Sequence, residues 1–186
     1  MGSANWQFFQ EFLKSPRVVA SLVPSSPLLE RRLVRAGDVG NASVVVELGS
    51  GTGGTTRALL EAMDPAARLI AIERHAPFAR ALADIDDDRL VIEHGCASAL
   101  GDALARCGAH SADVVVSGIP FSTLPPDVAR RIVAAVHGAL SPGGRFIAYQ
   151  VSDRVTDYAA AEFGRPRVEF ELCNVPPMRV FIWRKA

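Results

Sequence analysis

A glycine-rich turn that follows an acidic residue is the segment of this chain best suited to chemistry. Residues 44–54 read Val44-Val45-Val46-Glu47-Leu48-Gly49-Ser50-Gly51-Thr52-Gly53-Gly54, and a helical pattern follows from Thr55 to Met63. Glycine permits positive φ and lets a ligand approach the backbone closely, so this segment predicts a strand, a tight turn and the start of a helix. Such a turn is typical of a nucleotide-type cofactor site.

Two classes of cofactor fit this turn. Three of its glycines, Gly49, Gly51 and Gly54, satisfy the G-x-G-x-x-G dinucleotide pattern. The carboxylate of Glu47 would oppose a pyrophosphate, whereas it would suit the ammonium group of S-adenosylmethionine, directly or through water. Residues 47–53 also resemble the glycine motif of methyltransferases, an acidic residue two places before G-x-G-x-G. That resemblance implies a cofactor site formed by Glu47, Gly49, Ser50, Gly51, Thr52 and Gly53.

A second acidic residue ends the next strand candidate. Glu73 closes the run Arg68–Glu73 and stands 24 residues after Gly49, where a carboxylate can accept both hydroxyls of a ribose. NAD enzymes make the same contact, so Glu73 predicts an adenosine ribose without choosing between the two cofactors. We assign the following residue, Arg74, to the same site.

The third strand candidate is followed by Cys96 and Ala97, which we also assign to the cofactor. Many methyltransferases place an aspartate near this position to bond the adenine amino group. In this chain a backbone group, Ser98 or water must supply that contact. A packing role for Cys96 fits the sequence equally well.

The segment after the fourth strand candidate, Ser117-Gly118-Ile119-Pro120-Phe121, should border the reacting centre, because ligands of open parallel sheets bind beyond the carboxyl ends of the strands. It resembles the N-[ILV]-P-[YF] loop of adenine N6-dimethyltransferases but lacks the asparagine. An alkylamine acceptor, with a pKa near ~10, needs mainly deprotonation, desolvation and alignment with the methyl group.

We therefore assign Pro120, Phe121 and Tyr149 to catalysis on the acceptor side and Ser117 to the cofactor. An aromatic ring at Phe121 would stabilise a cationic ammonium by cation–π contact. The alternative for Phe121 is a core position beside a proline turn. No strong general base stands out in the sequence.

Apolar runs alternate with amphipathic segments from Val44 onward, which predicts βαβ units and a parallel sheet with helices on both faces. The strand candidates are Val44–Leu48, Arg68–Glu73, Leu90–His94, Asp113–Ser117 and Arg145–Val151. The helix candidates between them are Thr55–Met63, Pro77–Ala83, Ala97–Cys107 and Asp127–Leu140. Two last runs, Arg167–Cys173 and Met178–Arg184, are too close in sequence for a crossover and predict an antiparallel hairpin.

This arrangement is the pattern of the class I methyltransferase fold, an α/β, Rossmann-like fold with a seven-stranded, mostly parallel sheet and a C-terminal antiparallel hairpin. The turn at Leu140-Ser141-Pro142-Gly143-Gly144-Arg145-Phe146 is common in that class and argues against an NAD enzyme. At 186 residues we expect one domain, in which residues 1–43 add N-terminal helices to a core of residues 44–186.

The composition excludes several classes of protein. Lysine and arginine together balance aspartate and glutamate at 20 each, so nothing in the net charge predicts a nucleic-acid binder. No apolar run is long enough to span a bilayer, and no signal peptide is evident. Three cysteines without C-x-x-C spacing then indicate reduced thiols and a cytoplasmic location. Four scattered histidines predict no metal site.

The first residues predict an amphipathic helix over residues 5–14. Its aromatic side carries Trp6, Phe9 and Phe12, and Lys14 lies on the polar side. Such a helix either docks on a membrane or packs on its own domain. A proline- and serine-containing segment, residues 24–27, separates it from a second helix candidate, Leu28–Ala36.

Six segments, in order along nearly the whole chain, resemble the bacterial phospholipid N-methyltransferases, which methylate phosphatidylethanolamine stepwise. The segments are residues 12–16, 23–27, 47–53, 117–120, 140–146 and 174–177. The resemblance implies that the N-terminal helix docks on the membrane and that residues 24–27 help to cover the cofactor. We accordingly place Trp6, Phe9, Phe12, Lys14, Ser25 and Ser26 on the substrate or membrane side.

The sequence thus predicts an S-adenosylmethionine-dependent N-methyltransferase of phosphatidylethanolamine, peripheral on the inner face of the membrane. One alternative keeps the enzyme and changes the acceptor to rRNA adenine or a small soluble amine. Another is a non-catalytic membrane- or partner-binding protein with a vestigial cofactor site.

Overall fold

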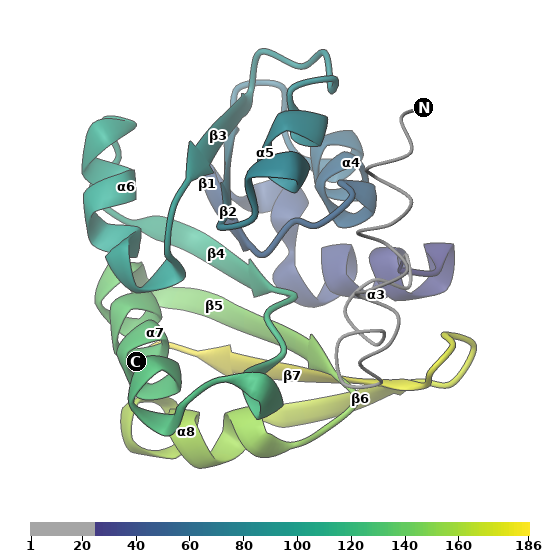
Figure 1. Ribbon diagram of the computed structural model, residues 1–186, viewed down its shortest axis with the longest axis vertical. Helices are drawn as coiled ribbons and strands as arrows, with labels where there is room; N and C mark the ends of the chain where they lie inside the picture. Colours follow the sequence, from purple (N-terminus) through teal and green to yellow (C-terminus); the bar gives the residue numbers. More distant parts are fainter. Residues whose placement is uncertain (1–24) are drawn as a thin grey trace.

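A seven-stranded sheet forms the centre of the protein, which the computed structural model describes over residues 25–186 (Figure 1). The strand order is β3-β2-β1-β4-β5-β7-β6. β1 to β5 are parallel, β7 runs antiparallel to β5, and β6 runs antiparallel to β7. The strands are β1 (Val44–Leu48), β2 (Arg68–Glu73), β3 (Leu90–His94), β4 (Ala112–Ser117), β5 (Leu140–Gln150), β6 (Arg167–Glu171) and β7 (Met178–Arg184). The predicted fold class is confirmed.

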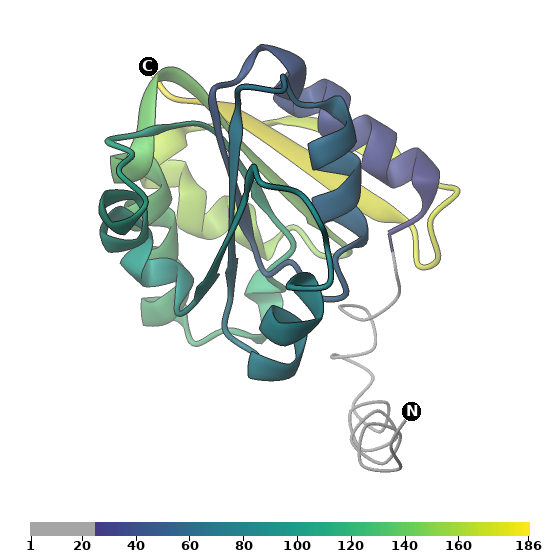
Figure 2. The same cartoon turned by 90° about the horizontal axis from the view of Figure 1, so that it is seen from above.

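Helices cover both faces of the sheet (Figure 2). The helices are α3 (Pro27–Gly37), α4 (Gly54–Ala62), α5 (Ala76–Leu82), α6 (Leu100–Arg106), α7 (Pro126–Ala139) and α8 (Arg154–Phe163). Buried residues of α3 and α4 pack with one face of the sheet, and those of α6, α7 and α8 pack with the other. Because both faces are covered, the central strands are apolar along nearly their whole length, as expected of a buried parallel sheet.

Short runs of β-branched residues located the strands well. The positions of β1, β2, β3 and β7 agree with the prediction to the residue. The largest difference in a strand is at β5, which begins at Leu140 rather than Arg145, because the proline-glycine turn itself pairs with Ala112 and Lys185. The predicted helix Ala97–Cys107 is also wrong at its start, since Ala97–Ala99 form a separate 3₁₀ turn before α6.

One helix, α8, was not predicted. It follows β5 and fills the crossover to the hairpin, where Val155 and Ala159 are buried against the same core as α7. Tyr158 and Phe163 pack against this core as well, so Val155, Tyr158, Ala159 and Phe163 form one apolar helix face, and the helical pattern was present in the sequence.

The N-terminal region is described only from Ser25 onward. The second predicted helix is present as α3, one residue longer at each end than predicted. The predicted helix of residues 5–14, with Trp6, Phe9, Phe12 and Lys14, lies outside the described residues. Within residues 25–186 no helix has the length and apolar character that crossing a bilayer requires.

Candidate active site

The glycine turn links β1 to α4 at the carboxyl edge of the sheet. Gly49 and Gly53 have φ of 75° and 83°, which L side chains rarely adopt. A Cβ on Gly53 would also meet Leu82 at 3.0 Å and Ile85 at 3.2 Å. Glycine is therefore required at this position by both conformation and packing, and the backbone at this edge stays open to a ligand.

Glu47 lies under this turn and is completely buried. One carboxylate oxygen, Oε2, accepts a hydrogen bond of 2.6 Å from the hydroxyl of Thr56, while Oε1 has no hydrogen-bond partner. Burial is the main cause that raises the pKa of Glu47 to about 7; the charge of Glu73 acts in the same direction, and the Thr56 and Ser50 hydroxyls act against it. An unpaired buried carboxylate oxygen is costly, so this site fits a cationic group such as the ammonium of S-adenosylmethionine.

Glu73 ends β2 beside the same turn and is nearly buried. Its two oxygens accept backbone hydrogen bonds, Oε2 from Gly51 at 3.0 Å and Oε1 from His75 at 2.7 Å. These bonds fix the carboxylate toward the turn, and each oxygen retains a second lone pair. The geometry therefore fits the predicted contact with two ribose hydroxyls.

A cavity of about 300 Å³ opens beside Glu73. Its lining includes seven residues that the sequence had singled out: Gly49, Gly51, Glu73, Arg74, Cys96, Ala97 and Pro120. The remaining wall is mostly apolar, from Phe78 on one side to Ile119 and Leu124 on the other. A flat apolar slot next to a ribose-type carboxylate fits an adenine ring.

Cys96 forms part of this slot and is exposed. Its Sγ lies 3.1 Å from the hydroxyl of Ser98, and this hydrogen bond lowers the pKa of the thiol from its ordinary value. Cys96 is thus not the buried packing cysteine of the alternative interpretation. Within residues 25–186, no three histidine, cysteine or acidic side chains gather as metal ligands would.

A chain of hydroxyl groups lies on the other side of Glu47. The Ser25 hydroxyl is 3.3 Å from that of Thr55, which is 3.4 Å from the hydroxyl of Tyr149. Tyr149 stands where a side chain of Gly118 would be, because a Cβ there would meet its hydroxyl oxygen at 2.5 Å. Burial raises the pKa of Tyr149 to about 12, as does the nearby charge of Glu47, so the phenol stays protonated at neutral pH.

Several predicted site residues lie away from this centre. Phe121 is fully buried, packs against Tyr158 in the core and does not line the cavity, so its placement beside the acceptor is corrected. Ser117 is also fully buried, and its hydroxyl accepts the backbone N–H of Ile119 at 3.3 Å. Successive side chains of a strand point to opposite faces of the sheet. A residue at the end of a strand therefore does not always point its side chain into the cavity.

Two further residues have positions different from those expected. Thr52 is exposed at the tip of the glycine turn and does not line the cavity. Ser26 caps α3: its hydroxyl accepts the backbone N–H of Leu29 at 3.2 Å. The Ser26 side chain therefore has a structural contact rather than a position beside the substrate.

Sequence reasoning missed other residues of the site. Phe78, Leu124 and Val128 line the adenine-sized slot, and Thr55 joins Ser25 to Tyr149. The signal for Phe78 was present, since the first turn of a helix after β2 must lie near the carboxyl edge of the sheet. The position of Thr55 had no such signal, because it depends on how α3 sits on α4.

Comparison with known proteins gives a consistent assignment. A family model described as a methyltransferase domain matches residues 46–146, more than half of the chain. An ornithine lipid N-methyltransferase from Singulisphaera acidiphila is 36% identical over 183 residues, covering 95% of this chain and 94% of that protein. A ribosomal RNA small subunit methyltransferase A from Phenylobacterium zucineum is 32% identical over 69% of this chain but only 43% of its own length.

The fold agrees with solved methyltransferase structures. The O-methyltransferase TomG from Streptomyces achromogenes, solved in complex with S-adenosylmethionine, superimposes with a TM-score of 0.69 at 17% identity, covering 88% of this chain and 82% of that chain. The carboxylates and the apolar slot described above suit the same cofactor. The chain therefore belongs to the methyltransferase domain family and is a class I, S-adenosylmethionine-dependent methyltransferase similar to lipid N-methyltransferases.

Proposed function

We propose that this enzyme transfers the methyl group of S-adenosylmethionine to the amine of a membrane lipid. The lipid acceptor is supported by the ornithine lipid N-methyltransferase, which matches the chain almost from end to end. Ornithine lipid and phosphatidylethanolamine both present a primary alkylamine, and we propose these two headgroups as acceptors. The enzyme would then work on the cytoplasmic surface of a membrane.

The observation that carries this proposal is the position of Tyr149 over Gly118. In adenine methyltransferases of the N-[ILV]-P-[YF] type, an asparagine stands where this chain has Gly118. A side chain at Gly118 would collide with the Tyr149 hydroxyl at 2.5 Å and its ring carbon Cζ at 3.0 Å. A phenol therefore occupies the space beside Gly118, and we propose that it suits an alkylamine, which needs alignment, better than a delocalised adenine amine.

S-adenosylmethionine, when bound, supplies an electrophilic methyl group on its sulfonium. We propose that Glu47 and Glu73 hold the two ends of this donor by its ammonium and its ribose. The Tyr149 oxygen would accept a hydrogen bond from an N–H of the acceptor amine, with the phenol proton donated to Thr55. An N–H donated in this way leaves the single lone pair of the neutral amine free for in-line attack, so catalysis rests mainly on orientation and desolvation.

We infer that the acceptor loses its proton to water before it binds. Glu47 has a pKa raised to about 7 but is already bonded to Thr56 and completely buried. Tyr149 stays protonated at neutral pH because its pKa is raised to about 12. Neither group is therefore a suitable base for an alkylammonium.

A parallel transfer assay tests this function. The wild-type enzyme would be given the methyl-labelled cofactor with ornithine lipid, phosphatidylethanolamine, ribosomal RNA or ethanolamine, and the products identified by mass spectrometry. We expect label in a lipid and none in RNA, with Glu47→Ala as the inactive control. Transfer to RNA alone would favour the adenine acceptor suggested by the ribosomal RNA methyltransferases. Binding of the cofactor with no transfer to any acceptor would overturn the enzymatic proposal.

A further inference from the structure

The edge strand β6 has an unusual distribution of polar and apolar side chains. Glu169 and Glu171 lie on the face that meets α3, and Glu171 is only 5% exposed. The alternate residues Val168 and Phe170 are 39% and 56% exposed. A strand normally buries its apolar face and exposes its polar face. In β6 this arrangement is reversed.

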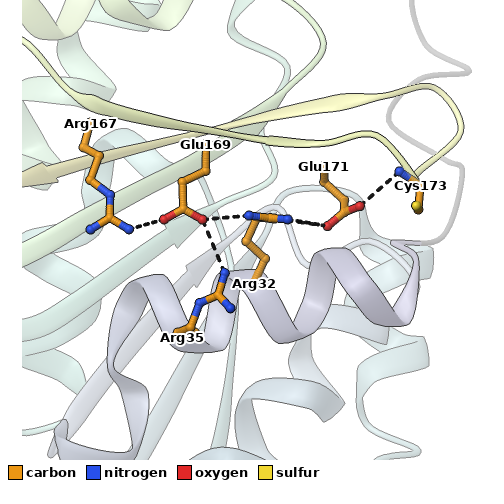
Figure 3. Close-up of polar contacts among 6 residues, drawn as sticks. All are labelled: Arg32, Arg35, Arg167, Glu169, Glu171 and Cys173. Carbon is orange, nitrogen blue, oxygen red and sulfur yellow. Dashed lines mark hydrogen bonds and ion pairs between the residues drawn. The ribbon is translucent and has the colours of Figure 1, made fainter.

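Ion pairs hold the polar face inward (Figure 3). Arg32 of α3 bridges both carboxylates, with N–O distances of 2.9 Å to Glu169 and 3.0 Å to Glu171. Glu171 also accepts the backbone N–H of Cys173 at 3.0 Å, which fixes the start of the turn. The hydrogen bonds to Arg32 and Cys173 keep the pKa of Glu171 below its ordinary value, so the network is charged at neutral pH.

This anchoring leaves an apolar tip on the hairpin, which we define as Phe170, Leu172 and Val175. Leu172 and Val175 are 72% and 77% exposed, the highest values among the large apolar residues of the part described. Leu28 at the start of α3 and Val151 after β5 are exposed beside it. Isolated exposed apolar residues are common, but a rigid projecting group of them marks an interaction site.

The position of the tip indicates what it meets. β6 runs in the same direction as β5, so the tip lies at the carboxyl end of the sheet, where the cofactor cavity opens. Figures 1 and 2 both show the hairpin projecting beside the first turn of α3. The first described residues of the chain lie here as well, because the backbone N–H of Ser26 donates to the side chain of Asn174 in the hairpin turn.

One cation completes the surface. Arg179 is paired with Phe170 across the hairpin, and its guanidinium donates to the backbone carbonyl of Val151. An arginine between exposed apolar side chains matches the boundary of a bilayer, where phosphates lie just above the acyl chains. A protein partner or a second copy would not need an arginine among exposed apolar side chains at the carboxyl edge of the sheet.

We propose that the apolar tip of the β6–β7 hairpin inserts into the membrane surface and holds the acceptor side of the active site against the lipid headgroups. This inference rests on the proposed lipid acceptor. It assigns the surface that brings the enzyme to that acceptor.

Vesicle co-sedimentation of the full chain tests the proposal. The vesicles consist of phosphatidylcholine, which has no net charge, so that binding does not arise from attraction between opposite net charges. We expect the double variant Leu172→Asp, Val175→Asp to bind at least tenfold more weakly than wild type. The charge-matched control, Ala105→Asp with Ala134→Asp, adds the same charges at exposed positions on α6 and α7 and should bind as wild type does. Equal binding by wild type and the hairpin variant would overturn the proposal.

A fluorescence measurement tests insertion without weakening the surface. The variant Phe170→Trp is made in a Trp6→Phe background, where the other tryptophan, Trp183, is buried. Lipids brominated on the acyl chain should quench the new tryptophan, and absence of quenching would contradict insertion. Sedimentation velocity provides a further check on the oligomeric state of both proteins. If the wild type is a dimer and the hairpin variant is a monomer, the partner of the tip is a second copy of the chain, and the proposal is overturned.

The two proposals fail in different ways. If the lipid acceptor is wrong, the wild-type enzyme transfers no methyl group to lipid in vesicles or in detergent micelles. If only the docking surface is wrong, transfer to lipid occurs and the hairpin variant methylates lipid vesicles as fast as wild type. Calorimetry should find the same cofactor affinity in wild type and the hairpin variant.

Discussion

The side chain of Asn174 accepts a hydrogen bond of 2.9 Å from the backbone N–H of Ser26, which lies 148 residues earlier in the chain. The same amide donates to the carbonyl of Pro176 at 2.9 Å, so one buried side chain ties the hairpin turn to the start of α3. Residues 25–27 and 174–177, which are far apart in the sequence, therefore form one structural unit. This unit positions Ser25, whose hydroxyl continues to Thr55 and Tyr149.

The first prediction concerns this tie. Asn174→Ala removes a buried amide and leaves the half-buried N–H of Ser26 without its acceptor, and we expect a loss of about 1–3 kcal/mol in the free energy of unfolding by urea. The KM for the acceptor should rise while cofactor affinity changes little, because Ser25 moves and Glu47 does not. Asn41→Ala, which removes an exposed hydrogen bond to Asp38, is the control and should cost less than about 0.5 kcal/mol. A stability loss of equal size in both variants would contradict the assigned role.

The second prediction is a pH dependence of cofactor binding. If Glu47 binds the ligand ammonium, the ionised carboxylate is required, and its pKa of about 7 in the free enzyme sets the range. We expect the Kd for S-adenosylhomocysteine, measured by calorimetry, to be constant above about pH 7.5 and to rise by up to about tenfold per unit below pH 6.5. Glu47→Gln should bind S-adenosylhomocysteine weakly at every pH. If the Kd of that variant still depends on pH, the titrating group is not Glu47.

The third prediction is that Glu47→Gln stabilises the free enzyme at neutral pH. Between the ordinary pKa of 4.5 and the folded value of about 7, the folded state holds a proton that the unfolded chain has released. The stability of the wild type therefore falls as pH rises through this range, by up to about 3 kcal/mol, and the variant escapes this loss.

Urea unfolding at pH 5 and pH 8 measures the effect. The stability of Glu47→Gln relative to wild type should increase between the two values. Glu61→Gln, at an exposed position on α4, is the matched control and should show no such change. A pH-independent difference for Glu47→Gln would show that desolvation of its charge is unimportant.

The fourth prediction tests the space between β4 and β5. Gly118→Ala places a Cβ within 3.1 Å of the carbonyl oxygen of Gly49 as well as on Tyr149, so the phenol must move. We expect kcat to fall at least tenfold with the fold retained. Gly138→Ala, in α7 with open space around it, should leave kcat unchanged and stabilise the protein by up to about 1 kcal/mol. Full activity of Gly118→Ala would exclude Tyr149 from orienting the acceptor.

The fifth prediction separates Tyr149 from a purely structural tyrosine. Tyr149→Phe keeps the ring and removes the hydroxyl, so kcat should fall about tenfold to a hundredfold while the Kd of the cofactor stays the same. Tyr158→Phe is the matched control, because the ring of Tyr158 packs against Phe121 in the core. Similar kinetics for the two variants would assign Tyr149 to packing alone.

Much of the fold could be predicted because local chemistry determines it. The β-branched run of β1 and the glycines after it define a strand and a turn without reference to the rest of the chain, and the short connection after β6 requires a hairpin. The helix α8 was missed although Val155, Tyr158, Ala159 and Phe163 follow helical spacing, so its position was also predictable from the local sequence.

The site divides in the same way. Glu47 and Glu73 were found because strand ends of a parallel sheet meet at one edge. Phe121 was misplaced because the direction of a side chain after a strand depends on the turn, and here a 3₁₀ turn directs it into the core. The tie between Ser26 and Asn174 was beyond prediction from local sequence, since it depends on how the last hairpin packs on the first described helix.

That tie also has a consequence for synthesis. The strands and turns that carry Glu47 and Glu73 are complete once β4 has left the ribosome, whereas Ser26 meets its partner only after Asn174 has emerged. Contacts so distant in sequence form late, because a long loop must close first. The residues that line the cofactor cavity, of which Ile132 of α7 is the last in sequence, therefore leave the ribosome well before Asn174, and the contact between Ser26 and Asn174 is expected to form last.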